Sequence, residues 1–297
     1  MSVGRGVGME LTVVETDADY EAFRQVRMAV LPYERCATVE ELRKARTDTR
    51  LMVVARVGGT LVGSGLADRG DTADGFVAPR VLEEHRRQGY GTAILEALVE
   101  HLRSVDLWSA KAGADDAGSV AFAARHGFVE VDREVEQVRT IGDEPEPEPV
   151  PGLEVVTLAE HPDLWSRAYE PFGREAMSDF ALYAPLEVSQ EKWELDWAGD
   201  PMFLALDQGE VVGCAGLFVD TDVPDRGEHA LTAVRRTHRG RGIAVHLKQR
   251  TLHWAAGHGL REVYTWTQQG NAPMRALNER LGFRDGITSV TVSKDLT

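Results

Sequence analysis

Two short stretches decide how this sequence is interpreted: HRRQGYGTA, from His85 to Ala93, and HRGRGIAVH, from His238 to His246. Each places an arginine three residues before a glycine and opens a segment with apolar residues at helical spacing. Glycine lets a backbone approach a ligand closely, and the N–H groups at a helix start attract phosphate. The residues expected to bind such an anion are Arg86, Arg87, Gly89 and Gly91 in the first stretch, and Arg239, Gly240, Arg241, Gly242 and Ala244 in the second.

One such loop is more often an ordinary turn than a binding site, but here two loops lie in register. The second loop starts 153 residues after the first, and the Gly-Phe pair ending at Phe283 follows the pair ending at Phe128 by 155 residues. Between the halves, IGDEPEPEPVPG alternates proline with glutamate, which is typical of a stiff, solvated linker. We expect an N-terminal domain over 1–142, a linker over 143–152 and a C-terminal domain over 153–297.

The composition limits the classes of function. With 43% hydrophobic and 27% charged residues, the 297-residue chain has the composition of an ordinary soluble protein. A net charge of -15 argues against nucleic-acid binding, which depends on neutralised phosphates. We find no apolar run long enough for a membrane span and no signal peptide, and Cys36 and Cys214 give no disulfide framework. We therefore expect a cytoplasmic protein with neither nucleic-acid nor membrane partners.

The order of elements is the same in both halves and predicts a mixed α/β sheet, built twice. In the first half, strands are expected over 9–15, 51–57 and 60–67, with another leading into the loop, a long helix after it, a strand over 105–111 and a helix ending at the Gly-Phe pair. A Rossmann site would place the glycine loop after the first strand. Here it follows the fourth strand, and no Walker A lysine is present.

These residues resemble the GNAT superfamily of N-acetyltransferases, in the tandem arrangement of which mycothiol synthase is an example. The resemblance covers nearly all of both halves and rests on VLEEHRRQGYGTA with ARHGF, and on TAVRRTHRGRGIA with NAPMRALNERLGF. It implies two acyl-CoA N-acyltransferase domains, in which the fourth and fifth strands separate around the pantetheine arm of acetyl-CoA and the pyrophosphate lies on the loop. Val81 and Val234 would then lie beside pantetheine. Asn271, first of all a helix N-cap, would also lie near it.

The resemblance also suggests a base for deprotonating an amine. In one branch of the superfamily a catalytic glutamate lies eleven residues before the loop arginine, and Glu228 has that spacing from Arg239. An exposed carboxylate at a strand end is an equally good interpretation. In the first half Gly75 takes that position beside Asp74, and Pro79 removes a backbone donor near Val81.

Other positions have less specific interpretations. Many members carry a tyrosine four residues before the Gly-Phe glycine as general acid, but Ala123 and Asn278 stand there. His253 and His258 have the wrong spacing for a metal pair and are expected to face solvent, so we predict no metal site. The aromatic and acidic stretch over 178–197 precedes a strand in the region that borders the acceptor site in the superfamily. Whether its carboxylates face a ligand is left open.

Together these patterns predict an acyltransferase that moves an acetyl group from acetyl-CoA to a primary amine of a small molecule, with the C-terminal domain catalytic. The N-terminal domain is expected to hold coenzyme A without transferring its acetyl group, because Gly75 and Pro79 alter the strand where the thioester would be activated. The alternative is a non-catalytic coenzyme-A-binding sensor or scaffold, since the usual tyrosine is absent from both halves.

Overall fold

The computed structural model describes residues 2–6, 8–70, 74–180, 188–219 and 223–297, with only the backbone described for residues 2–6. The chain forms two compact units. The N-terminal unit comprises residues 1–132 together with 289–297, and the C-terminal unit comprises residues 133–288. Part of the acidic and aromatic stretch over 178–197, residues 181–187, lies outside the described residues.

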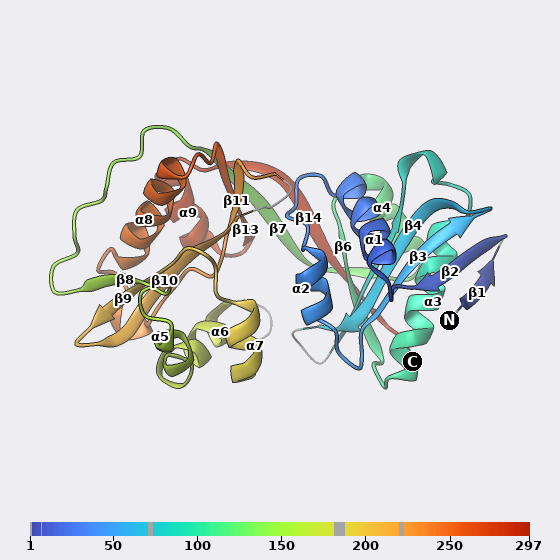
Figure 1. The fold of residues 1–297 in the computed structure, drawn as a ribbon, viewed down its shortest axis with the longest axis horizontal. Coiled ribbons are helices and arrows are strands. Elements are labelled where there is room, and N and C mark those ends of the chain that lie inside the picture. The colour runs from blue at the N-terminus through green and yellow to red at the C-terminus, as the bar shows by residue number, and fades with distance from the viewer. Residues whose placement is uncertain (1, 7, 71–73, 181–187, 220–222) are drawn as a thin grey trace. The chain divides into compact units, whose positions relative to one another are not determined.

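The N-terminal unit contains one mixed sheet (Figure 1). Its strands follow the order β1 (Ser2–Gly6), β2 (Met9–Val13), β3 (Leu51–Val57), β4 (Thr60–Arg69), β5 (Gly75–Val81), β6 (Ser109–Ala114) and the end of β14 (Arg284–Asp295). Neighbouring strands are antiparallel except for β5 and β6, which are parallel. Their ladder joins only Gly75 to Ala110 and Phe76 to Lys111, so most of β5 has no strand partner on that side.

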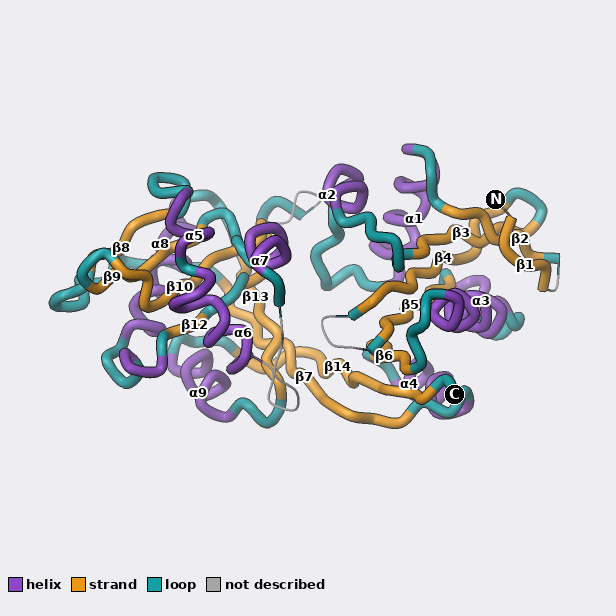
Figure 2. Tube along the Cα trace, turned by 90° about the horizontal axis from the view of Figure 1, so that it is seen from below, coloured by secondary structure: helices purple, strands orange, loops and turns teal. Residues whose placement is uncertain are grey.

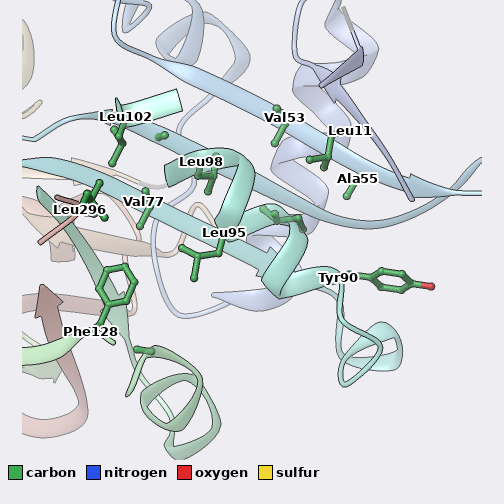
Figure 3. Packing of buried hydrophobic residues seen from close by; sticks show 14 of the residues in the cluster. Leu11, Val53, Ala55, Val77, Tyr90, Leu95, Leu98, Leu102, Phe128 and Leu296 are labelled. Carbon is green, nitrogen blue, oxygen red and sulfur yellow. The ribbon is translucent and has the colours of Figure 1, made fainter. Parts of the chain in front are cut away.

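Helices cover both faces of this sheet, with α1 on one side and α3 on the other (Figure 2). The helices are α1 (Asp17–Val30), α2 (Val39–Lys44), α3 (Tyr90–Ser104) and α4 (Ala117–Arg125). Alternate residues of β3 explain the arrangement, since Val53 packs in the cluster that contains α3 and Val54 in the cluster that contains α1. Leu95, Leu98 and Leu102 of α3 lie over Val77 and beside Leu296 (Figure 3). Their helical spacing places them on the buried face.

The C-terminal unit repeats this plan. Its strands follow the order of the end of β7 (Val129–Thr140), β13 (Glu262–Gln268), β11 (Arg226–His229), β10 (Glu210–Val219), β9 (Met202–Asp207) and β8 (Glu154–Thr157), while β12 (Ala233–Val234) also pairs with β10. Its helices are α5 (Asp163–Arg167), α6 (Arg174–Phe180), α7 (Gln190–Asp196), α8 (Ile243–Gly257) and α9 (Ala272–Arg280). The parallel pair is now β11 and β13. Both units therefore place a parallel, early-ending ladder next to the strand that leads into the glycine loop.

In the second sheet, too, successive strand residues pack on opposite faces. Leu204 lies in a cluster with Trp165 and Trp193, from α5 and α7, whereas Phe203 lies in a cluster with Leu247 of α8. The two tryptophan rings stack with centroids 4.0 Å apart, and each indole N–H donates to the other residue's carbonyl oxygen, at 3.1 and 3.0 Å. These tryptophans of the second half thus form core structure.

The compact units divide the chain differently from the linker-based prediction of domains over 1–142 and 153–297. Strand β7 begins in the N-terminal unit and ends in the C-terminal unit, and β14 does the reverse (Figure 1). Residues 134–140 pair with β13, while residues 290–295 pair with β6. The proline-rich segment has no helix or strand over residues 143–150. It is held by the C-terminal unit, because Glu144 pairs with Arg139 at 2.5 Å and Glu146 with Arg250 at 2.5 Å.

Candidate active sites

The two glycine loops have the same geometry. Gly89 immediately precedes α3 with φ of 88°, and Gly242 precedes α8 with φ of 81°, a left-handed backbone that suits glycine. Among the described residues no side chain caps either helix, so the N–H groups of each first turn point out of the helix without a side-chain acceptor from that part of the chain. Each loop therefore offers backbone donors and the positive end of a helix dipole to an anion.

The first arginine of each loop donates a hydrogen bond to the strand that precedes the loop. Arg86 Nε donates to the Val81 carbonyl at 3.3 Å, and Arg239 Nε donates to the Val234 carbonyl at 3.0 Å. The structure thus brings together the strand valine and the loop arginine in both halves. The Nε atom of each guanidinium therefore helps to hold the loop in its conformation.

In the N-terminal unit the predicted cofactor residues line one cavity of about 750 Å³. Val81, Arg86, Arg87, Gly89 and Gly91 all contribute to its wall. It also touches residues 78–80 of β5 and 112–114 of β6, beyond the end of their ladder, and reaches Arg27 and Val30 of α1. The cavity therefore extends from the loop, past the separated strands, to the face covered by α1.

Strand β5 presents few donors to this cavity. Gly70 N donates to Asp74 O at 2.8 Å and Leu82 N to Val62 O at 3.0 Å, at the two ends of the β4–β5 ladder. In an antiparallel ladder the bonded positions alternate, so the odd-numbered residues of β5 turn their N–H groups toward β6. Pro79 is one of these residues and lacks an N–H. The register thus places the missing donor on the side of the separated strands.

The corresponding strand of the C-terminal unit is broken by a bulge between β11 and β12. Ala230 N donates to Gly216 O and Arg235 N to Val212 O, both at 2.9 Å, and Ala233 lies opposite Cys214. Two steps along β10 therefore face three steps along its partner, which is the definition of a bulge. Within the part of the chain that the structure describes, the N–H groups of Leu231 and Thr232 have no hydrogen-bond partner.

Glu228 lies on β11, three residues before this bulge. It is half-buried and faces Tyr264 of β13 in the parallel register. The Tyr264 hydroxyl donates to Glu228 Oε2 at 3.1 Å. Arg226 places its guanidinium 4.0 Å from the centre of the Tyr264 ring and pairs with Glu136 at 2.8 Å and Glu262 at 2.7 Å. The carboxylate predicted as base is thus oriented by a phenol whose ring contacts the Arg226 guanidinium.

The loop arginines of the C-terminal unit contact carboxylates of the same unit. Arg239 Nη2 lies 2.5 Å from Asp179 of α6, and the Arg236 guanidinium binds the same carboxylate. Glu175, one turn earlier, accepts a hydrogen bond of 2.6 Å from Arg236 N. The hydrogen bond from Arg236 lowers the pKa of Asp179, with a further contribution from Arg239. Two carboxylates of α6, Glu175 and Asp179, therefore face the loop.

A second carboxylate contacts the far side of this loop. Asp207, at the end of β9, lies 3.4 Å from Arg241 and 3.2 Å from His238. Gly240 and Gly242 are exposed beside these pairs, and Ala244 lies in the first turn of α8. The loop of the C-terminal unit is thus contacted by three acidic residues, Glu175, Asp179 and Asp207.

Asn271 and Asn278, the two remaining positions that the sequence singled out, form hydrogen bonds with other parts of the fold. Asn271 caps α9, its Oδ1 accepting a hydrogen bond from Met274 N at 3.3 Å. Asn278, at the position where the resemblance implies a tyrosine in many members, is fully buried and donates to Gln137 at 2.9 Å and Thr267 at 3.3 Å. This position is therefore closed to solvent by β7.

Comparison with known proteins identifies the family. A model of the acetyltransferase (GNAT) family matches residues 17–128 and 160–283, more than half of the chain. The chain belongs to the GNAT family. It has the tandem form of that family, since each match covers one half of the chain.

Similar proteins in this family include mycothiol acetyltransferases. The protein of that name from Saccharomonospora viridis is 28% identical over 239 residues, 75% of each chain. The one from Parafrankia sp. is 28% identical over 267 residues, 78% of this chain and 79% of the relative. Among solved structures, a tandem GNAT protein from the clavulanic acid biosynthesis pathway gives a TM-score of 0.78 at 20% identity and covers 97% of this chain and 99% of its own. A GCN5-related N-acetyltransferase from Sphaerobacter thermophilus gives 0.74 at 20% identity, covering 98% and 96%.

Membership of this family shows that the chain belongs to the acyltransferases. None of the helices in the described ranges is long and apolar enough to cross a bilayer. Of the two histidines predicted to face solvent, His258 is exposed, but His253 is half-buried and bonded through Nδ1 to the Glu144 carbonyl at 2.8 Å. That bond forms because the proline-rich segment lies against α8.

Two residues of these sites were not found from the sequence. Tyr264 could have been found by aligning the two parallel strands, because it lies in register with Glu228. Asp179 carries no motif. It reaches the second loop through contacts between elements far apart in the chain, which a local pattern does not record.

Proposed function

We propose that this GNAT pair transfers an acetyl group from acetyl-CoA to a primary amine of a small molecule, and that the transfer takes place in the C-terminal unit. The observation that carries the proposal is the bulge between β11 and β12. Its two unpartnered N–H groups, on Leu231 and Thr232, provide donors of the kind that stabilise an oxyanion. The corresponding strand in the N-terminal unit has Pro79 on the side of the separated strands.

The residues of both loops fit coenzyme A. Gly89 and Gly242 leave open space around their Cα atoms, and the uncapped helix starts supply donors for a pyrophosphate. Arg86 and Arg239 would hold each loop in place, with Val81 and Val234 beside pantetheine. The bound thioester supplies the acyl group, and the loop and strand contribute its orientation.

Glu228 would accept the proton of the amine, directly or through a water molecule. An amine is mostly protonated at pH 7, so attack on the thioester requires a base. The hydrogen bond from the Tyr264 hydroxyl fixes the position of Oε2 and thereby orients the carboxylate. The small-molecule acceptor is supported by the mycothiol acetyltransferases to which the chain is similar.

A second candidate places the transfer in the N-terminal unit. It is favoured by the cavity of about 750 Å³, which lies beside the first loop. Asp74, the acidic residue nearest to the position equivalent to Glu228, is paired with Lys111 at 2.6 Å. A base in this unit would therefore have to come from the cavity wall.

The test is release of the coenzyme A thiol from acetyl-CoA in the presence of a panel of small amines, with the product identified by mass spectrometry. We expect Glu228→Gln to lower turnover by roughly 100-fold, the usual scale for general-base catalysis, with little change in acetyl-CoA affinity. Tyr264→Phe is the matched variant, which keeps the ring and removes the hydroxyl that donates to the carboxylate. An unchanged rate for Glu228→Gln between pH 6 and pH 9 would remove Glu228 from the mechanism.

Loop variants of the full chain distinguish the candidates. Loss of activity with Gly242→Val and retention with Gly89→Val supports transfer in the C-terminal unit. The opposite result places the chemistry beside the N-terminal cavity. Acetyl-CoA binding without acetyl transfer to any amine would support a sensor or scaffold.

A further inference from the structure

The end of the N-terminal cavity nearest α1 contains charged side chains that the proposed function does not use. Arg27 of α1, Arg80 of β5 and Asp115, which directly follows β6, all line this cavity. They are distinct from the loop residues 86–91, which are assigned to coenzyme A. Arg80 is an even-numbered residue of β5 and points to the α1 face, where its guanidinium lies 5.9 Å from the centre of the Phe23 ring.

Three polar atoms of this cluster are buried and have no hydrogen-bond partner within the described residues: Arg27 Nη1, Arg80 Nη1 and Asp115 Oδ1. A buried donor or acceptor without a partner costs roughly 1–3 kcal/mol, and more when it is charged. Folded proteins usually satisfy such atoms with protein groups or water. Three of them belong to residues that line one cavity, which favours a ligand with complementary groups.

The charges of the cluster are only partly compensated. Arg27 pairs with Glu34 at 2.8 Å, and Asp115 accepts a hydrogen bond of 2.8 Å from the Tyr33 hydroxyl. Arg80 forms no ion pair with any described carboxylate. Burial, followed by the positive charge of Arg27, lowers the pKa of Arg80 to about 10, although the negative charges of Glu34 and Asp115 act in the opposite direction. An anion next to both guanidinium groups would relieve this unfavourable placement.

We propose that this part of the cavity binds a zwitterion, a small molecule with a carboxylate and an ammonium group as in an α-amino acid. The carboxylate contacts Arg27 and Arg80, whose planar guanidinium groups suit it. The ammonium group contacts Asp115, which has one oxygen to spare. Val30, Leu31 and Phe76, also on the cavity wall, provide apolar contacts for the rest of the molecule. The inference goes beyond the proposed function, because it concerns binding in the N-terminal unit and does not depend on which unit transfers the acetyl group.

The experiment is isothermal titration calorimetry on the full chain saturated with coenzyme A, with the common L-amino acids added one at a time. For the amino acid that binds best, the matching amine without the carboxylate and the matching acid without the amine are titrated next. We expect each analogue to bind at least about tenfold more weakly, because each leaves buried charges unpaired. Arg80→Met should weaken the amino acid by a similar factor. Arg69→Met, an exposed arginine on β4 outside the cavity, is the matched control and should change nothing.

Several results would overturn the proposal. One is that no amino acid binds at millimolar concentration. Another is that the acid analogue binds as tightly as the amino acid. A third is that Arg80→Met and Arg69→Met bind the amino acid with equal affinity. Asp115→Asn provides a variant of the same shape if Arg80→Met does not fold, and it should weaken the amino acid while leaving the acid analogue unaffected. Because this experiment measures binding of an amino acid, a negative result is distinguishable from a failure of acetyl transfer, which is measured by thiol release.

Discussion

Gly242 and Gly259 offer a matched pair for testing the second loop. Both have a left-handed backbone, with φ of 81° and 79°, and a Cβ at either would meet no atom within 4 Å. Valine at either position should therefore cost a similar amount of stability, about 1–2 kcal/mol, from backbone strain alone. Only Gly242→Val should also weaken acetyl-CoA binding to the C-terminal unit, measured by calorimetry on a Gly89→Val background that removes the first loop. Equal affinities for the two variants would contradict the assignment of this loop.

Lys248 of α8 is nearly fully buried, with an exposed fraction of 1%. Desolvation lowers its pKa from 10.5 to about 7, so the folded state disfavours the charged form. The unfolded chain binds this proton more tightly between pH 7 and pH 10.5, and stability gained from neutral Lys248 rises with pH over that window. Nearby His229 is also buried, which holds its pKa well below 6.5, so it stays neutral over the same range.

We accordingly expect Lys248→Met to stabilise the protein at pH 6 by roughly 3–5 kcal/mol, at about 1.4 kcal/mol per pKa unit, and by much less at pH 9.5. Urea unfolding at the two pH values measures the difference. Lys44→Met serves as the control, because Lys44 is exposed and pairs with Glu40 at the surface. A gain that does not change with pH would show that burial of the charge is not the cause.

At the scale of elements, α6 and the second loop interact through charge. Asp179 binds both Arg236 and Arg239, which lie where a pyrophosphate would approach the helix start. Since a carboxylate and a phosphate compete for the same guanidinium groups, Asp179→Asn should raise the affinity of the C-terminal unit for acetyl-CoA by several-fold. Calorimetry on the Gly89→Val background measures it. Asp163→Asn, which breaks an exposed pair with Arg167 on α5, should leave the affinity unchanged. A weaker affinity in Asp179→Asn would show that this carboxylate supports the loop.

At the scale of the whole molecule, strands β7 and β14 make each compact unit depend on both halves of the chain. A chain of residues 1–146 lacks Val290, Val292 and Leu296, all buried in the core of the N-terminal unit. Burial of three such side chains contributes roughly 5–9 kcal/mol, which is comparable to the stability of an entire domain. We expect residues 1–146 alone to fail to fold, and residues 147–297, which lack residues 133–140, to fail likewise.

Co-expression of the two fragments should restore a folded complex, measured by copurification and cooperative thermal unfolding. As a control, residues 1–146 joined through a flexible linker to residues 286–297 should recover the missing strand. Cooperative unfolding of either fragment alone would show that the exchanged strands are dispensable.

Much of this protein could be predicted from local sequence. The repeated loops, the order of strands and helices, and the family follow from patterns that extend over at most some twenty residues, and the structure bears out the mixed α/β fold in both halves. The glycines at the helix starts could be predicted because their backbone conformation is a local property. The roles of Glu228 and of the loops stay predictions.

Tertiary structure alone decided three features: which unit receives the end of β14, which carboxylates face the second loop, and which side chains complete the N-terminal cavity. Strand 290–295 pairs with β6 through a ladder whose partners are about 180 residues apart, and Asp179 meets Arg239 across 60 residues. Alternating strands of similar composition can pair in several ways, and only the buried side chains and the register available in the folded core select one. The physical reason is that local patterns specify the faces of each element, whereas the neighbour of each face is chosen by packing of the whole chain.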